Sequence, residues 1–227
     1  MKILLLVDIQ NDFCPGGALE VPDGDGVVEV ANALMQSGDF DCVIATKDYH
    51  PSDHVSFVDN HSGGQPFEVR DVDDIAQVLW PRHCEQGTQG AEFHPNLDAT
   101  RITYVVEKGT QPKIDSYSGF FDNARQNETR LKSLLNEITH GVASSSVELV
   151  VCGLALDYCV KATALDAAEL GFDTSVVIDA CRAVNINEGD DLKALQELAR
   201  ANVTIVESRE LLPTPSRSRE HAKELHP

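Results

Sequence analysis

Two cysteines stand seven positions apart in the apolar-rich stretch LVVCGLALDYCVKATALDAAELGF, residues 149–172. Free cysteine is among the most buried residue types, so a role in the core is the default interpretation for either thiol. Cys152 lies inside a β-branched run and fits that interpretation. Cys159 instead follows a short turn and begins a helical pattern that Gly171 ends. We therefore predict that only Cys159 does chemistry.

The position of Cys159 predicts a nucleophile. A thiol at a helix N-terminus lies near unpaired backbone N–H groups, which stabilise the thiolate. Asp8 ends one apolar run and Lys108 follows another, so we expect Asp8 to act as the base and Lys108 to neutralise and orient it. The backbone N–H groups of Ala155 and Cys159 are the candidate oxyanion hole.

A second group of residues has the composition of a metal site. The segment KDYHPSDH places Asp48 and His50 two positions apart after an apolar run, and WPRHC adds His83. One carboxylate and two imidazoles with open positions suit catalytic zinc, iron(II) or manganese. The spacing alone fits a chance cluster about equally well. His54 could add a fourth contact, although an exposed or simply hydrogen-bonded side chain is the favoured interpretation.

Three aromatic side chains lie near these residues in the sequence. Phe13 is five residues from Asp8, and Trp80 is three residues from His83. An average aromatic residue is more often core than ligand contact. Because Phe13 and Trp80 lie so close to candidate site residues, we expect them, together with Tyr117, to line a pocket rather than to belong to the core.

The elements that must position these side chains alternate along the chain. Continuous β-branched runs, typical of parallel strands buried on both faces, occur at 3–7, 42–46, 102–106, 147–153, 174–178 and 203–207. Apolar residues return every three or four positions at 26–35, 125–138, 159–170 and 188–201, which predicts helices. This alternation predicts an α/β fold, a three-layer α/β/α sandwich.

The candidate residues all follow strands. Ligand sites of open parallel sheets lie beyond the carboxyl ends of the strands, so Asp8, Asp48, Lys108 and the turn before Cys159 should meet at one edge. The segment 50–100 breaks the alternation and is rich in Gly, Pro, Asp and His. A connection of that length inside a compact domain is usually functional.

Composition excludes several classes of function. With 18 basic and 37 acidic residues among 227, the chain carries a formal charge of −19, which repels nucleic acid and anionic membranes. The length suits one domain, expected at 1–212, followed by a tail at 213–227 that we expect to be disordered. The first apolar run has five residues, too few for a signal peptide or a membrane span.

The cysteine pattern points to a reducing compartment. The chain has six cysteines without CxxC pairs, so we expect reduced thiols and a cytoplasmic location. No disulfide framework is predicted.

Blocks of sequence covering nearly everything before the tail resemble the nicotinamidases of the isochorismatase-like hydrolase family. They include DIQNDFCPGGAL (8–19), ATKDYHPSDHVSF (45–57), VLWPRHCEQGTQGAEFHP (78–95), EKGTQ (107–111), YSGF (117–120), GLALDYCVKATALDA (153–167) and DACRAVN (179–185). The resemblance implies a six-stranded parallel sheet between helices and a cis peptide bond between Leu154 and Ala155. Leu156 stands where many relatives have threonine, and the spacer between Lys108 and YSGF can be shorter in relatives.

The resemblance also implies roles for the candidate residues. Asp8, Lys108 and Cys159 would form a catalytic triad, the metal would be held by Asp48, His50 and His83, and the pyridine ring would be enclosed by Phe13, Trp80 and Tyr117.

The implied reaction is hydrolysis of the small-molecule substrate nicotinamide to nicotinate and ammonia through a cysteine thioester, a step of NAD salvage. One divalent metal ion would assist, with zinc favoured over iron or manganese. Three alternatives stay open: a related amidohydrolase acting on a carbamoyl or ureido compound, a metal oxygenase, and a non-catalytic binding module. The sequence leaves a homo-oligomer open.

Overall fold

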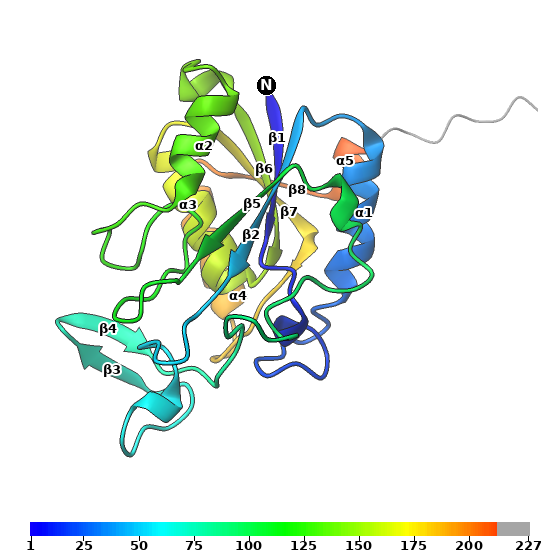
Figure 1. Ribbon diagram of the computed structural model, residues 1–227. Coiled ribbons are helices and arrows are strands. Elements are labelled where there is room, and N and C mark those ends of the chain that lie inside the picture. The colour runs from blue at the N-terminus through cyan, green and yellow to red at the C-terminus, as the bar shows by residue number, and fades with distance from the viewer. Residues whose placement is uncertain (213–227) are drawn as a thin grey trace, which may run out of the picture.

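The computed structural model describes residues 1–212, which contain a six-stranded sheet flanked by helices (Figure 1). All neighbouring strands in this sheet are parallel. In spatial order the strands are β5 (Tyr104–Lys108), β2 (Cys42–Asp48), β1 (Lys2–Val7), β6 (Glu148–Leu154), β7 (Asp173–Arg182) and β8 (Thr204–Val206). The predicted α/β class and the six-stranded parallel sheet are confirmed.

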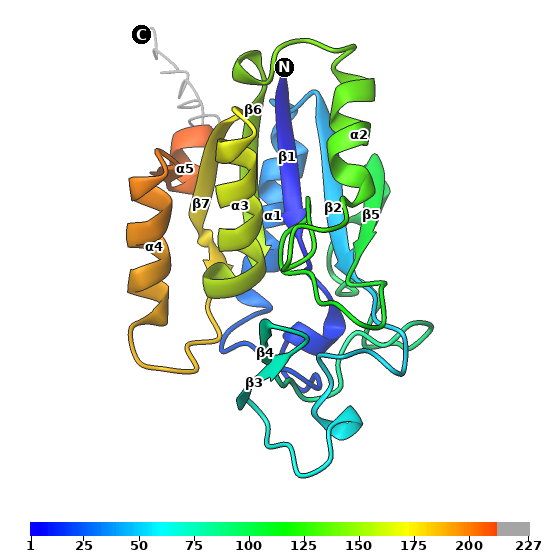
Figure 2. The same cartoon turned by 90° about the vertical axis from the view of Figure 1, so that its left-hand side faces the viewer.

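The helices lie in two layers, one on each face of the sheet (Figures 1 and 2). One layer contains α2 (Arg130–Ile138), α3 (Lys161–Glu169) and α4 (Asp190–Arg200), and the other contains α1 (Gly26–Ser37) and α5 (Ser208–Leu211). Single helical turns occupy 11–13, 58–60, 99–101 and 144–146.

The central strand explains the layering. Residues 3–7 of β1 are at most 1% exposed, because helices cover both faces of the sheet and β2 and β6 pair with its two edges. A strand buried in this way needs a continuous apolar run, which ILLLV supplies. The polar residues that follow such strands are thereby carried to the carboxyl edge of the sheet.

Two parts of the predicted secondary structure were incomplete. The helix expected from residue 125 begins at Arg130, because Arg125 has a φ of +56° and the Thr129 side chain caps the helix by accepting a hydrogen bond from Leu131 N. Inside the long segment 50–100 the chain forms a hairpin of β3 (Val69–Val72) and β4 (Ile75–Val78). The predicted tail at 213–227 lies outside the described residues.

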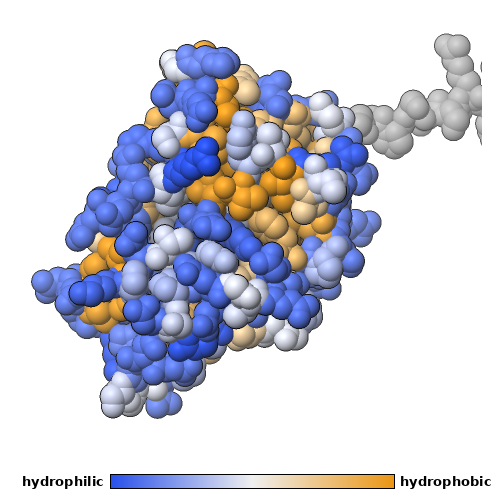
Figure 3. Space-filling view, in the orientation of Figure 1, coloured by the Kyte–Doolittle hydropathy of each residue, from blue (hydrophilic) through white to orange (hydrophobic). Residues whose placement is uncertain are grey.

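The molecular surface is mainly polar, with an apolar patch near the sheet edge (Figure 3). In the view of Figure 3 this patch lies between α2 and α1, over the region of the edge strand β5. Tyr104 and Val105 of that strand are 36% and 45% exposed. Within residues 1–212, no helix is both long and apolar enough to cross a membrane.

Strand β6 contains an irregularity just before the predicted nucleophile. Its register with β7 shifts between Val151 and Gly153, and Gly153 has a φ of +124°. A Cβ atom on Gly153 would lie 2.1 Å from Val7 O, so only glycine allows β1 and β6 to approach this closely. The backbone then continues through a cis peptide bond between Leu154 and Ala155, which confirms that prediction.

Substitution of Gly153 by alanine should therefore destabilise the fold severely. We expect Gly153→Ala to lower the free energy of unfolding by about 3 kcal/mol or more, because strain at positive φ adds to a backbone clash. Gly38→Ala is the matched control: its φ is +77° but nothing lies within 4 Å of the new Cβ, so about 1–2 kcal/mol is expected. Urea unfolding of both variants measures the difference, and equal losses would contradict the clash.

Candidate active site

Lys108 connects the groups at the carboxyl edge of the sheet. Its Nζ atom lies 2.9 Å from Asp8 Oδ2, 2.7 Å from Asp48 Oδ1 and 3.4 Å from Cys159 Sγ. It also donates a hydrogen bond to Ser116 O at 2.9 Å. Burial opposes the charge, but Asp48 and Asp8 outweigh it and raise the pKa of Lys108 well above its ordinary value. The lysine is therefore a fixed cation shared by two carboxylates and a thiol.

Asp8 is fully buried at the end of β1. Thr46 Oγ1 donates to Asp8 Oδ1 at 2.6 Å, while Oδ2 faces Lys108. Apart from this ion pair, Oδ2 makes no hydrogen bond in the part of the chain that the structure describes. Burial, supported by the nearby charge of Asp48, raises the pKa of Asp8 against the opposing effect of Lys108. Asp8 thus has an oxygen free to accept a proton and a raised basicity.

Cys159 lies in a widened helical turn, Leu156–Val160, that leads from β6 directly into α3. Its Sγ atom is within 4.8 Å of a carboxylate oxygen of Asp8. Burial raises the pKa of the Cys159 thiol well above its ordinary value, although Lys108 acts in the other direction. This effect of burial acts against the stabilisation of the thiolate that is expected at a helix N-terminus, so ionisation of the sulfur calls for the nearby base, Asp8, that the sequence predicts.

The turn that carries Cys159 is closed around Ala155. Tyr158 N and Val160 N both donate to Ala155 O, at 3.1 and 3.0 Å. Ala155 and Cys159 both line the same pocket. The two residues predicted to form an oxyanion hole are thus placed together beside the thiol.

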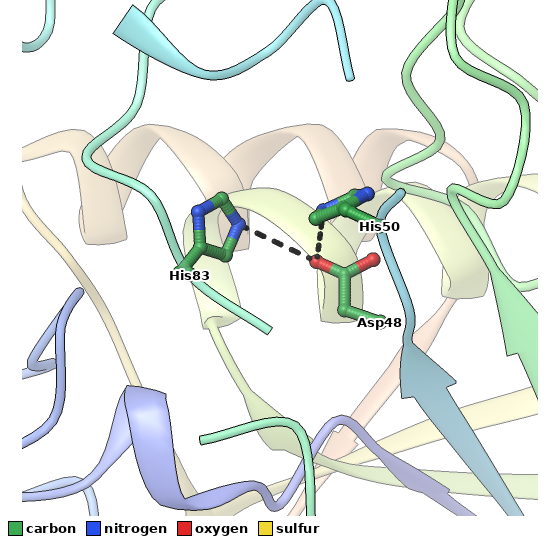
Figure 4. Close-up of side chains that lie close together, drawn as sticks. All are labelled: Asp48, His50 and His83. Carbon is green, nitrogen blue, oxygen red and sulfur yellow. Dashed lines mark ion pairs between the residues drawn. The ribbon is translucent and has the colours of Figure 1, made fainter. Parts of the chain in front are cut away.

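Asp48, His50 and His83 converge as the sequence predicts (Figure 4). Asp48 Oδ2 lies 3.2 Å from His50 Nε2 and 3.7 Å from His83 Nε2. All three side chains are buried. Burial opposes ionisation of Asp48, but Lys108 and His50 outweigh it and hold the pKa of its carboxyl well below the usual range.

The outer nitrogens of the two imidazoles show that this donor set fits a cation. His50 Nδ1 is 2.8 Å from Gly109 O, and His83 Nδ1 is 2.7 Å from Pro81 O. A carbonyl only accepts, so each Nδ1 carries a proton, and each ring in its neutral form would present an Nε2 lone pair to a cation. Two lone pairs and a carboxylate oxygen within 4.8 Å of one another are a donor set for a divalent metal ion.

His54 is buried beside this cluster. Its ring stacks on His50 with 4.0 Å between centroids, and its Nδ1 lies 2.7 Å from Ser56 Oγ. His54 forms a second group with His50 and Asp115, and it is not part of the group formed by Asp48, His50 and His83. The favoured interpretation of His54 as a hydrogen-bonded side chain is confirmed, although it is not exposed.

A pocket of about 340 Å³, its open mouth included, lies between the two groups. Phe13, Trp80 and Tyr117 line it, as the sequence predicts, and Trp80 Nε1 donates to Tyr117 OH at 3.1 Å. The sequence analysis assigned no role to four further lining residues: Leu19, Asp115, Tyr158 and Val184.

Tyr158 is the clearest omission among them. Its ring packs edge-on against Trp80, with centroids 4.8 Å apart. Its position directly before Cys159 was an available signal.

Comparison with known proteins gives concordant matches. The model of the isochorismatase domain matches residues 2–210. A nicotinamidase of Escherichia coli (strain K12) is 46% identical over 90% of this chain and 93% of its own length. A solved Acinetobacter baumanii nicotinamidase pyrazinamidase is 41% identical with a TM-score of 0.86, covering 93% of this chain and 98% of that one.

A pyrazinamidase of Pyrococcus horikoshii, solved in complex with zinc, is 34% identical with a TM-score of 0.70. The match covers 91% of this chain and 98% of that one. The sequence blocks, the fold and these matches agree: this chain belongs to the isochorismatase domain family and groups there with the nicotinamidases.

Proposed function

We propose that this protein is a nicotinamidase, an amidohydrolase that converts nicotinamide and water to nicotinate and ammonia. The observation that carries the proposal is the meeting of two centres at one pocket. Cys159, which contacts Lys108, and Asp48 and His83 of the metal-type donor set line the same pocket. The similarity to nicotinamidases along nearly the whole chain supports the same substrate.

The first half-reaction forms a thioester. Asp8 Oδ2 accepts the Cys159 proton, and Lys108, 3.4 Å from Sγ, stabilises the thiolate that results. Burial raises the pKa of both Asp8 and Cys159. The higher pKa of Asp8 makes it a better acceptor for the proton of the less acidic thiol. The sulfur attacks the carboxamide carbon, and the backbone N–H groups of Ala155 and Cys159 hold the oxyanion. Asp8 then protonates the amide nitrogen, the C–N bond breaks and ammonia leaves.

The second half-reaction regenerates the thiol. Water attacks the thioester carbon while Asp8 accepts a proton from it. The C–S bond breaks, nicotinate leaves, and the proton returns from Asp8 to the sulfur. Throughout, Thr46 and Lys108 hold the carboxylate of Asp8 in place.

Asp48, His50 and His83 would hold one divalent metal ion, with zinc the preferred candidate. When bound, the metal supplies a Lewis acid that the lone pair of a pyridine nitrogen can contact. Phe13, Trp80 and Tyr117 would enclose the aromatic ring between this nitrogen and the nucleophile. The zinc found with the Pyrococcus horikoshii pyrazinamidase supports this choice of metal.

The reaction would place the protein in the salvage of nicotinamide towards NAD, in the cytoplasm. The six free and buried cysteines are consistent with a reducing compartment.

Removal of the nucleophile should abolish turnover. We expect Cys159→Ala to lower kcat for ammonia release from nicotinamide at least about 10⁴-fold, because no other group can form the thioester. Cys152→Ala, in the same segment but fully buried within β6, should keep its activity. Full turnover by Cys159→Ala would exclude the thiol mechanism and favour a metal oxygenase or another chemistry.

Substitution of the proposed base, Asp8, should slow the reaction without reducing the metal content of the protein. Asp8→Asn keeps the shape of the side chain but cannot accept the thiol proton, so we expect kcat to fall about 10²–10⁴-fold. Asp166→Asn, a buried carboxylate of α3 outside the pocket, is the control. Metal analysis of both variants should match the unaltered protein, and an Asp8→Asn enzyme with normal kcat would remove Asp8 from the mechanism.

The pyridine nitrogen should account for part of the specificity. Benzamide has the same shape as nicotinamide but lacks that nitrogen, so we expect kcat/KM to favour nicotinamide about 100-fold. Removing the metal with a chelator should reduce this preference, and adding Zn²⁺ should restore it. A preference that survives chelation would contradict the proposed role of the metal.

The same ammonia assay separates this function from its alternatives. Faster release from a carbamoyl or ureido compound than from nicotinamide would favour the related amidohydrolase. Binding of nicotinamide without turnover would indicate a binding module.

A further inference from the structure

Asp115 is a carboxylate in the pocket that the proposed mechanism does not use. It belongs to the segment between β5 and α2, it is 3% exposed, and it lines the same pocket as Asp48, His83 and Cys159. One of its oxygens lies within 4.8 Å of a ring nitrogen of His50. Asp115 therefore lies next to the donor set of Asp48, His50 and His83 without belonging to it, and groups instead with His50 and His54.

The contacts of Asp115 are neutral. Ser116 N donates to Oδ1 at 2.7 Å, and Gln77 Nε2 donates to Oδ2 at 3.1 Å. Gln77 is 2% exposed and also donates to Val78 O, so its amide is fixed. Within residues 1–212, no lysine or arginine forms an ion pair with Asp115, and the basic groups beside it are the imidazoles of His50 and His54. A buried carboxylate without a cation is costly unless positive charge lies close by.

The charges around the pocket show where that positive charge would come from. Three carboxylates, Asp8, Asp48 and Asp115, are buried in this region, and in the described part of the chain Lys108 pairs with Asp8 and Asp48. With the imidazoles neutral, as metal ligands must be, three negative charges against one positive charge leave an excess of two. A divalent cation held by Asp48, His50 and His83 would balance this excess.

We propose that Asp115 is a positioning residue that strengthens the binding of the divalent cation by its charge, without being a ligand. The inference rests on the metal site proposed above and is independent of the identity of the amide substrate. In the metal-free protein the same charge repels Asp48 and Asp8, which offsets part of the stability that the hydrogen bonds from Ser116 and Gln77 contribute. Loss of the Asp115 charge should therefore cost less stability than loss of a carboxylate needed only for structure.

Asp115→Asn is the decisive variant, because it removes the charge and keeps the shape and one acceptor oxygen. The apparent Kd for Zn²⁺, measured by competition with a chromogenic chelator on chelator-stripped protein, should rise at least about tenfold. Urea unfolding of the stripped protein should show a smaller loss of stability for Asp115→Asn than for Asp122→Asn. Asp115→Ser should weaken Zn²⁺ binding in the same way and serves if the first variant does not fold.

Asp122→Asn is the matched control. Asp122 is a buried carboxylate that accepts hydrogen bonds from the backbone of Ala124, Gln126 and Asn127 and does not line the pocket. Its substitution should lower stability and leave the Kd for Zn²⁺ unchanged.

Two results would overturn the inference: a normal Kd for Zn²⁺ in Asp115→Asn, or weakened binding accompanied by the stability loss seen in Asp122→Asn. Absence of Zn²⁺ binding by the unaltered protein would instead refute the proposed metal site.

Discussion

The ion pairs of a single buried ammonium group organise the candidate site. Lys108 Nζ contacts Asp8, Asp48 and the sulfur of Cys159, and these side chains come from three different parts of the sequence. Burying so many ionisable groups would be prohibitive without mutual compensation. The positive charge of Lys108 offsets the cost of burying the two carboxylates, and its contacts hold the base Asp8 and the nucleophile Cys159 near each other. The pocket can then exclude water around the reacting carbon while its charges stay in place.

The sheet makes this convergence possible. Asp8, Asp48 and Lys108 end or follow the neighbouring strands β1, β2 and β5, and the nucleophile turn follows β6 on the other side of β1. Gly153 lets β6 come close to β1 just before that turn. Where relatives share this fold, the same strand ends are available for different chemistry.

Much of this arrangement could be predicted from the sequence. Continuous apolar runs identified the six strands, and polar residues at their ends identified Asp8, Asp48 and Lys108. The raised pKa of Cys159 could not be predicted, because burial depends on side chains that arrive from elsewhere in the fold. Asp115 was missed for a similar reason, since an acidic residue in a loop has no periodicity that marks it as facing a pocket, whereas Tyr158 could have been inferred from its position beside Cys159. The spacing of Asp48, His50 and His83 fitted a chance cluster equally well, and only the resemblance to the nicotinamidases singled them out as metal ligands.

The carboxylate of Asp48 divides its two oxygens between two centres: Oδ1 faces Lys108, and Oδ2 faces both histidines. One side chain therefore belongs to the acid–base apparatus and to the cation site at once. A substitution of Asp48 that changes metal binding therefore also changes the electrostatic potential at the sulfur of Cys159, because Lys108 loses one of its two carboxylate partners. Metal binding and activation of the nucleophile are thus coupled through this one side chain.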